Sequence, residues 1–485
     1  MTGPFGRPWV TTADIINRYH SLFLMGAGTM QVSKSPFAPC CAGFLALLLV
    51  AGCENSAPAS ANNSSQSPNV IIVLTDDLGY GDIGAYGAKR IKTPNIDQLA
   101  DRGILFTNAY ASANVCSPSR AGLMTGRYAV RSGLAWKVVG ANDKHGLPES
   151  EETLGELAKR AGYMTHYIGK WHLGGFPDYL PGKHGFDSFF GVPHSNDMPG
   201  FVLYENDQVI DTDIDQALLT QRYTESALQF IEAQGDQAFL MVVSHTFPHI
   251  PLYASEQFRG KSEAGAYGDT IEEIDWSTGK IVEALKKTGQ LENTVIIFTS
   301  DNGPFFEGRT AGLKGGKGNA WEGGFRVPLI VSWPGKVAHA RSSDAITVNT
   351  DILPTVAHAI AIEPGSLDLD GKSLMGILEG EQHSPHEFIY LFNNERVVGV
   401  RSQDWKLVTH AYYTGSLGSF EKFDQLSGFD QPYDLLFDMR QSDGEAYSVA
   451  NRQPAELNTH QVALRNARAK FGPMRTRDLE KTYPD

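Results

Sequence analysis

The stretch Asn69-Val-Ile-Ile-Val-Leu-Thr75 is a continuous apolar run of strand length, and Asp76-Asp77 follows it at once. A run without polar alternation predicts a strand buried on both faces, as in a parallel sheet. The stretch Thr294-Val-Ile-Ile-Phe-Thr299 has the same character, and Asp301-Asn302 follows it after one serine. In an open α/β sheet, ligands bind beyond the carboxyl ends of the strands. We therefore expect these two polar pairs to lie together at one edge of a sheet.

Around these two strands the sequence alternates between strand and helix patterns. Further strands are predicted at 103–106, 163–168, 238–244 and 327–332, and helices at 94–102, 117–125, 268–287 and 351–361. Such alternation predicts an α/β fold with a large, mostly parallel sheet sandwiched by helices.

The pattern changes near residue 386. Short strands are predicted at 387–391, 396–401 and 405–410, with a terminal helix at about 455–471. Short strands joined by polar turns predict a smaller antiparallel sheet. We therefore expect a catalytic α/β domain over 69–385 and a C-terminal α+β subdomain over 386–485.

The chain is acidic, with 41 Lys and Arg against 55 Asp and Glu among 485 residues, a formal net charge of −14. Such a chain has no general electrostatic attraction for nucleic acid, so no nucleic-acid partner is expected. An anionic substrate would need a local cluster of cations. The hydrophobic fraction of 41% is ample for one large core, or for a large and a small one.

The N-terminal region carries an export signal. Residues 42–52 form an apolar run that is too short to span a bilayer and is typical of a signal peptide. Its end, Val50-Ala51-Gly52-Cys53, resembles a bacterial lipobox, in which the cysteine is lipidated. Residues 53–68 are rich in Ser, Ala, Asn and Pro, which predicts a flexible tether. We expect 1–52 to be a lipoprotein-type signal peptide, with an ordinary secretory signal as the alternative.

Cysteine usage singles out one residue. The four cysteines are Cys40, Cys41, Cys53 and Cys116. Only Cys116 lies in the predicted folded domain, so no disulfide can form within it. A lone cysteine in an exported protein is open to oxidation, so its presence indicates that it has a function.

The neighbours of Cys116 indicate that task. Cys116-Ser-Pro-Ser-Arg120 continues into Thr125-Gly-Arg127, and this stretch resembles the signature of type I, formylglycine-dependent sulfatases, which include the arylsulfatases and belong to the alkaline phosphatase superfamily. The resemblance implies that a maturation enzyme converts Cys116 to formylglycine. The predicted helix start favours an anion there, and Arg120 lies one turn further on. Aerobic and anaerobic maturation both remain open.

The resemblance also implies a metal site at the two strand ends. Three carboxylates and an amide oxygen form a hard, all-oxygen donor set, which suits Ca²⁺ better than metals that prefer His or Cys. The expected ligands are Asp76, Asp77, Asp301, Asn302 and the oxygen at position 116 that replaces the sulfur of Cys116.

Four further segments resemble sulfatase active-site segments: 169–174, 193–197, 244–251 and 314–326. Their implied functional residues are Lys170, His172, Ser195, His249 and Lys317. In the implied roles, Lys170 and Lys317 neutralise the sulfate together with Arg120, and Ser195 lines the pocket. His249 protonates the leaving oxygen, and His172 takes a proton from the second hydroxyl of hydrated formylglycine.

The sequence thus predicts an enzyme that hydrolyses organic sulfate esters, with sulfated glycans as natural substrates and aryl sulfates as surrogates. Two alternatives remain: a phosphonate monoester or phosphodiester hydrolase of the same superfamily, and a non-catalytic, lipid-anchored glycan-binding protein. Substrate specificity is expected in loops 130–147, 193–206 and 305–314. The aromatic group of His410, Tyr412 and Tyr413 could stack on a sugar or simply pack the subdomain.

We predict that Cys53 is lipidated and that the protein is exported to the periplasm or cell envelope. Glu54 follows it in place of the aspartate that retains lipoproteins at the inner membrane, so the outer membrane is expected. Cys53→Ala should move the protein from membrane to soluble fractions on ultracentrifugation. Unchanged fractionation would contradict the lipid anchor.

Overall fold

The computed structural model describes residues 67–337, 340–409, 434–441 and 445–476. Predictions for the signal peptide, Cys53, and the group of His410, Tyr412 and Tyr413 lie outside these residues. Within the described ranges, no helix is long and apolar enough to cross a membrane.

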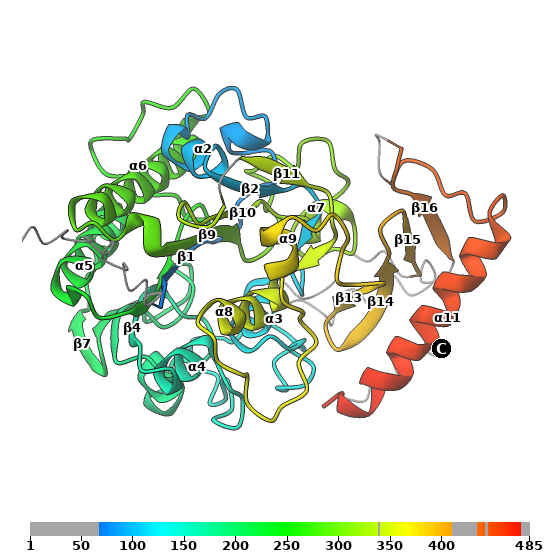
Figure 1. Ribbon diagram of the computed structural model, residues 1–485, viewed down its shortest axis with the longest axis horizontal. Coiled ribbons are helices and arrows are strands. Elements are labelled where there is room, and N and C mark those ends of the chain that lie inside the picture. The colour runs from blue at the N-terminus through cyan, green and yellow to red at the C-terminus, as the bar shows by residue number, and fades with distance from the viewer. Residues whose placement is uncertain (1–66, 338–339, 410–433, 442–444, 477–485) are drawn as a thin grey trace, which may run out of the picture. The chain divides into compact units, whose positions relative to one another are not determined.

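A ten-stranded sheet forms the main part of the protein (Figure 1). At its centre lie five parallel strands in the order β9, β1, β8, β4 and β5. Their bounds are Thr294–Ser300, Asn69–Thr75, Phe239–Ser244, Met164–Lys170 and Ser188–Val192. The two apolar runs in the sequence are therefore neighbours, and the predicted mostly parallel sheet is confirmed.

Shorter strands complete both edges of this sheet. On one side are β10, β2 and β11, at Leu329–Ser332, Gly103–Phe106 and Arg341–Ser343, and on the other β6 and β7, at Leu203–Glu205 and Gln208–Asp211. Strand β10 runs antiparallel to both β9 and β2. A separate two-stranded ladder joins β3 and β12, at Ala109–Tyr110 and Thr347–Val348.

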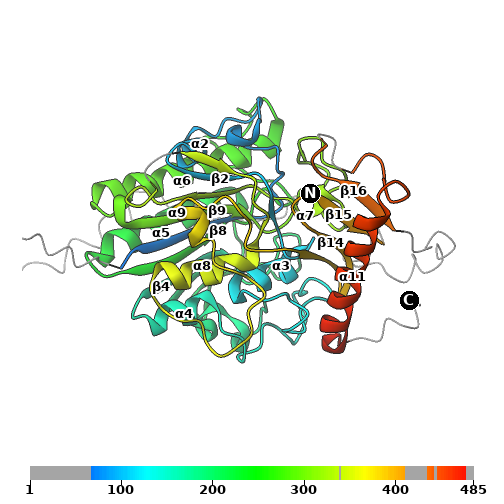
Figure 2. The ribbon, with the colours of Figure 1, turned by 45° about the vertical axis from the view of Figure 1, so that its right-hand side comes forward.

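Helices cover both faces of the large sheet. One layer contains α2, α5 and α6, at Pro94–Ala100, Leu219–Gln234 and Gly265–Lys287. The other contains α3, α4 and α8, at Cys116–Thr125, Leu154–Arg160 and Ile352–Ala359. Short helices α7 and α9 span Glu322–Phe325 and Met375–Glu379. Figure 2 shows α8 and α4 on the opposite side of the sheet from α6.

The central strand β1 explains why its sequence has no polar alternation. Ile71 and Val73 pack into the core beneath α2, α5 and α6, whereas Val70, Ile72 and Leu74 pack into the core beneath α3, α4 and α8. All five side chains are fully buried. Each face of the strand thus contributes to a different core, so every position favours an apolar residue.

A second, four-stranded antiparallel sheet follows near the C-terminus. Its strands β13, β14, β15 and β16 span Ile389–Asn393, Arg396–Arg401, Trp405–Val408 and Leu435–Asp438. Helix α11, at Pro454–Phe471, lies along this sheet (Figure 1). Strand β16 and helix α5 were not predicted, and α3 begins at Cys116, one residue earlier than predicted. The proposed domain boundary at 385/386 stays a prediction.

A buried ion-pair cluster joins the four-stranded sheet to α7 and to the two-stranded ladder. Glu322, the first residue of α7, contacts Lys406 of β15 at 3.0 Å and accepts a hydrogen bond from the Tyr110 hydroxyl at 2.7 Å. Lys406 also pairs with Glu445 at 2.7 Å, and Glu445 accepts from the Glu322 backbone N–H at 2.7 Å. Burial alone would raise the pKa of Glu322, but Lys406 and Arg401 outweigh it and lower the pKa to about 2.

We predict that Lys406→Met destabilises the protein strongly, because the methionine fits the space but leaves two buried carboxylates without their cation. Removing one member of a buried pair costs about 3–5 kcal/mol. The matched control is Lys159→Met, because Lys159 forms a half-exposed pair with Asp187 at 2.7 Å. That variant should lose about 0–1 kcal/mol. Urea unfolding of both measures the difference, and equal losses would contradict the structural role of the cluster.

Candidate active site

The register of the parallel strands brings the predicted metal ligands together. Thr75 of β1 lies opposite Ser300 of β9, and Leu74 lies opposite Ser244 of β8. The residues that follow β1 and β9 therefore leave the sheet at the same level. Strand β4 ends on the other side of β8 and delivers Lys170 to the same edge. Strands β1, β9, β8 and β4 thus bring residues to one edge of the sheet from their carboxyl ends, as expected for an open α/β sheet.

Short hydrogen bonds hold the strand-end residues in place. The Asp301 Oδ1 atom accepts from the backbone N–H groups of Asp77, at 3.1 Å, and Asn302, at 2.8 Å. The Asn302 side-chain amide donates to Asp77 Oδ1 at 2.7 Å. Asp77 itself has a positive φ of 65°, which non-glycine residues rarely adopt outside functional turns. The four predicted ligands Asp76, Asp77, Asp301 and Asn302 form one fully buried group.

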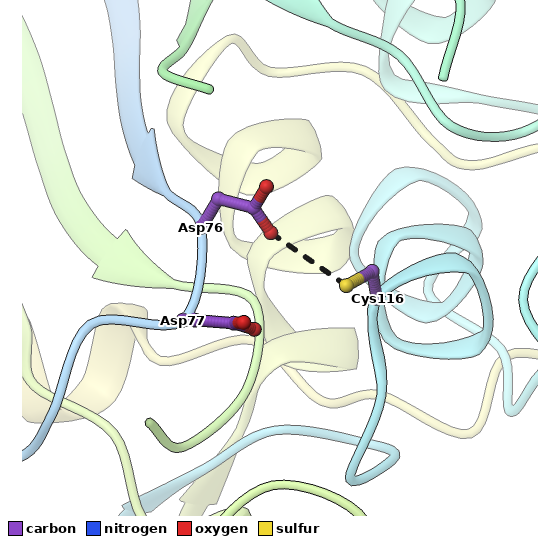
Figure 3. A group of neighbouring side chains, drawn as sticks. All are labelled: Asp76, Asp77 and Cys116. Carbon is purple, nitrogen blue, oxygen red and sulfur yellow. Dashed lines mark hydrogen bonds between the residues drawn. The ribbon is translucent and has the colours of Figure 1, made fainter. Parts of the chain in front are cut away.

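Cys116 faces this group from the first residue of α3. Its Sγ atom lies 3.6 Å from Asp76 Oδ1, as Figure 3 shows. Ligand atoms of Asp76, Asp77 and Cys116 all lie within 4.8 Å of one another. Burial raises the pKa of the Cys116 thiol far above its usual range, against the opposing effect of Lys170 and Lys317. The unmodified side chain would remain a protonated thiol, which is a weak nucleophile.

Arg120 lies one turn after Cys116 and is 1% exposed. Its Nε atom contacts Asp301 Oδ2 at 2.9 Å, and its Nη2 atom lies 3.4 Å from Asp76 Oδ1. Its Nη1 atom donates to the Ser244 hydroxyl, at 2.8 Å, and to the Lys170 carbonyl, at 2.7 Å. Protein groups thus hold the Nε and Nη1 atoms, whereas the buried Nη2 atom has no hydrogen-bond partner among the described residues, and the predicted contact of Arg120 with sulfate stays a prediction.

The two predicted sulfate-binding lysines form ion pairs with different carboxylates. The Lys170 ammonium forms an ion pair with Asp76 and donates to the Ser195 hydroxyl at 3.2 Å. The Lys317 ammonium contacts Asp77 Oδ2 at 2.8 Å. Burial would raise the pKa of Asp76, but Lys170 and the neighbouring cations hold it well below its usual range. Asp301 differs, because burial raises its pKa to about 7 although Arg120 opposes the shift.

His249 lies beside Asp77 with one ring nitrogen directed to the cluster. Its Nδ1 atom is 2.5 Å from the Ile250 carbonyl, which fixes the proton on Nδ1. Its Nε2 atom lies 3.7 Å from Asp77 Oδ2 and 3.4 Å from the Ser195 hydroxyl. Burial and the charge of Lys170 lower the pKa of His249. The Ser195 hydroxyl thus lies within reach of both Lys170 and His249.

His172 has the opposite tautomer. Its Nε2 atom lies 3.1 Å from the Val139 carbonyl, so Nε2 carries the proton and Nδ1 is the free acceptor. No group among the described residues forms a hydrogen bond with Nδ1, although the ring is buried. Burial and the charge of Lys170 hold the pKa of His172 well below its usual range. Like Asp77, His172 has a positive backbone φ, in this case 60°.

The sequence patterns do not reveal the residues that hold Arg120, Lys170 and His172 in place. Ser244 donates to the Lys170 carbonyl at 2.7 Å while accepting from Arg120. Val139, whose carbonyl holds His172, donates its N–H to the Ser117 hydroxyl at 2.9 Å. These contacts join residues far apart in the chain. The position of Ser244 at a strand end was the one sequence signal that could have revealed its role.

The oxygen donors fit a hard divalent cation. Asn302 Oδ1 is buried and has no hydrogen-bond partner among the described residues. An orphaned buried acceptor costs free energy unless something binds it, and a cation supplies that partner. The cluster is formally neutral, because its three carboxylates are balanced by the side chains of Arg120, Lys170 and Lys317. A divalent ion would give it the positive charge that an anionic ester needs. The residues present therefore fit a divalent cation beside a side chain at a helix N-terminus.

Comparison with known proteins identifies the family. The family model for Sulfatase matches residues 68–362, and the model for N-sulphoglucosamine sulphohydrolase, C-terminal, matches residues 316–430. The chain belongs to the sulfatase family, and it is a sulfuric ester hydrolase. The predicted enzyme class is therefore confirmed.

Three relatives illustrate the range of similar proteins. Human steryl-sulfatase is 36% identical over 70% of this chain and 74% of its own length. Human N-acetylgalactosamine-6-sulfatase is 37% identical over 66% of this chain and 67% of its own. The crystal structure of Ps i-CgsB in complex with k-i-k-neocarrahexaose has a TM-score of 0.73 and 28% identity, covering 83% of this chain and 93% of that one.

Proposed function

We propose that this enzyme removes sulfate from sulfated glycans, with formylglycine at position 116 and Ca²⁺ in the active site. The observation that carries the proposal is the position of Cys116. It begins α3, 3.6 Å from a buried carboxylate, within a cluster that also holds two lysines and two histidines. A helix N-terminus surrounded by cations favours an anionic group such as a sulfate ester.

Asp76, Asp77, Asp301 and Asn302 would hold the calcium ion, which supplies positive charge that polarises both the oxygen at position 116 and the sulfate. Formylglycine, in its hydrated form, supplies a hydroxyl nucleophile where the thiol of Cys116 would stay protonated. A formylglycine-generating enzyme is the maturation partner that this proposal requires.

The two lysines bind and orient the sulfate in this proposal. Lys170 and Lys317 enter from different segments, so their ammonium groups can contact different oxygens of one sulfate. Each is fixed by a metal-binding carboxylate, Lys170 by Asp76 and Lys317 by Asp77. Preorganised cations of this kind stabilise the charge that develops in the transition state. Arg120 contacts both Asp76 and Asp301 and so fixes the relative position of these two carboxylates.

The histidine tautomers define which ring nitrogen of each residue is available for proton transfer, and we propose that His249 serves the leaving oxygen and His172 the side chain at position 116. His249 holds its Nδ1 proton on the Ile250 carbonyl, so its Nε2 atom is the one that can carry a proton to the leaving oxygen. His172 presents an unprotonated Nδ1 atom, so it can accept a proton from the side chain at position 116. In the neutral state both rings therefore present an unprotonated nitrogen to the cluster, and His249 can donate from Nε2 only after that atom has taken up a proton.

The glycan assignment draws on the relatives and on the N-terminus. One relative is named for N-acetylgalactosamine, and another was crystallised with a neocarrahexaose, although a third is named for steryl sulfates. A predicted lipid anchor at Cys53 would hold the enzyme at the cell envelope, where polymeric sulfated glycans are encountered. A screen of sulfated saccharides, with phosphonate monoesters and phosphate diesters in parallel, tests the substrate class. Faster turnover of the phosphorus esters would favour the alternative hydrolase.

We predict that active protein contains formylglycine at position 116. Mass spectrometry of the tryptic peptide that ends at Arg120 should reveal the mass loss of thiol-to-aldehyde conversion. Cys116→Ala should give a folded protein without sulfatase activity. Full activity in protein that contains only unmodified cysteine would contradict the proposal.

We predict that calcium is required for turnover. Asp301→Ala should lower kcat on the order of a thousandfold, equivalent to about 4 kcal/mol of transition-state stabilisation. It should also abolish calcium binding measured by calorimetry after chelation. The control is Asp213→Ala, because Asp213 is an exposed carboxylate beyond β7. Normal turnover of the Asp301 variant in chelator would refute the metal assignment.

We predict that the two histidines can be separated by leaving-group chemistry. His249→Ala should slow sugar sulfates far more than nitrophenyl sulfate, because nitrophenolate leaves without a proton. His172→Ala should release about one equivalent of nitrophenol per enzyme in a burst and then stall. Equal losses on good and poor leaving groups for the first variant, with no burst for the second, would count against this division.

A further inference from the structure

The turn 304–309 is attached at its start to the loop that carries Lys317. The Pro304 carbonyl accepts a hydrogen bond from the Lys317 N–H at 2.8 Å. The turn is narrow, because a Cβ atom at Gly308 would lie 2.5 Å from the Pro304 Cβ atom. Residues 305–307 lie between these two positions, so they are close to the Lys317 loop.

The far end of the same turn is attached to the loop that follows Asp77. The Arg309 N–H donates to Asp82 Oδ2 at 2.7 Å, and the Arg309 carbonyl accepts from the Gly81 N–H at 3.0 Å. Asp82 is itself buried and accepts from the Tyr267 hydroxyl at 2.9 Å. The turn is therefore held between a loop that begins with a predicted metal ligand and a loop that carries a predicted sulfate-binding lysine.

Glu307, in the middle of this turn, interacts with the catalytic cluster. Burial raises the pKa of its carboxyl group, the charge of Asp77 adds to this shift, and the charge of Lys317 opposes it. Interactions between charges are largely screened beyond about 10 Å, so the carboxyl group lies near both side chains. Glu307 is only half-buried, and the Lys317 ammonium pairs with Asp77 and not with Glu307. The charge of Glu307 thus has no direct counter-ion among the residues that the structure describes.

The cluster opens to solvent on the side of this carboxylate. The side chains of Lys170 and Asp76 are 0% exposed. Those of His249, Lys317 and Asp77 retain 9%, 5% and 4% of their exposure. The leaving group of an ester bound at the cluster must therefore extend past these three side chains, and two of them act on the carboxylate of the turn.

We propose that Glu307 selects the leaving group, because its carboxylate accepts hydrogen bonds from hydroxyl groups next to the reacting ester and repels a second anionic substituent there. The inference rests on the proposed sulfate-ester site and deepens it by naming the substrate class. It assigns the enzyme to sugar rings that carry one sulfate, with uncharged hydroxyl groups beside it. Placing a like charge opposite an unpaired carboxylate costs affinity, and such repulsion is a common source of specificity.

The test compares substrates with and without a second anionic group in the mature, full-length enzyme. One pair is the best monosulfated sugar of the saccharide screen and the same sugar with a second sulfate on a neighbouring carbon. The other pair is 4-nitrophenyl sulfate with and without a carboxylate on the ring. The readout is the ratio of kcat/KM for the dianionic substrate to kcat/KM for the monoanionic one. Glu307→Gln should raise this ratio about tenfold, equivalent to about 1.4 kcal/mol, and Glu307→Lys should raise it further.

Glu292→Gln is the matched control, because Glu292 is an exposed glutamate that precedes β9, at the opposite end of this strand from Asp301. It removes the same charge about 20 Å from the cluster, so the ratio should stay within about twofold.

An unchanged ratio in both Glu307 variants would overturn the proposal. Equal losses on all substrates would overturn it too, because they would mean that the turn only supports Lys317. Faster turnover of the dianionic substrates by the wild-type enzyme would have the same consequence. If the wild-type enzyme desulfates no saccharide, the glycan assignment fails, and the aryl pair alone decides the role of Glu307.

Discussion

Three carboxylates are buried side by side where β1 and β9 end, and the guanidinium of Arg120 holds two of them apart and in place. Like charges at such distances in a low-dielectric interior repel strongly, and an unpaired buried charge costs several kcal/mol. Arg120 contacts Asp76 and Asp301 at once, and it spans from α3 to Ser244 and the Lys170 carbonyl. One side chain of α3 therefore contacts the carboxylates that follow β1 and β9 as well as the ends of β8 and β4.

A second buried ion-pair cluster lies where the four-stranded sheet contacts α7. Lys406 lies between Glu322 and Glu445, and Glu322 heads the segment that follows Lys317. The Gly324 carbonyl of that segment accepts a hydrogen bond from the N–H of Gly303, the residue after Asn302. The C-terminal sheet thus has a physical connection to the active site. A buried pair adds little net stability, but its geometry is specific, which suits a role in alignment.

Chemistry and specificity are built on different parts of the molecule. The charged cluster lies on strand ends and on one helix N-terminus, where packing allows little freedom. Substrate specificity is instead expected in loops such as 130–147, where the Val139 carbonyl contacts His172 and the Leu147 N–H donates to the Leu173 carbonyl. Loops can change without disturbing the core beneath them. A family that includes relatives named for sterol and for sugar sulfates is consistent with this separation.

The sequence by itself determined the fold class, the neighbouring strands β1 and β9, and the residues of the cluster, because apolar runs and short motifs are local signals. It could not reveal that β10 runs antiparallel, that Ser244 supports Arg120, or that Val139 sets the tautomer of His172. Those features depend on contacts between segments far apart in the chain, such as Ser244 and Arg120. Strand register and side-chain direction decide such contacts, and they are settled only when the whole core packs.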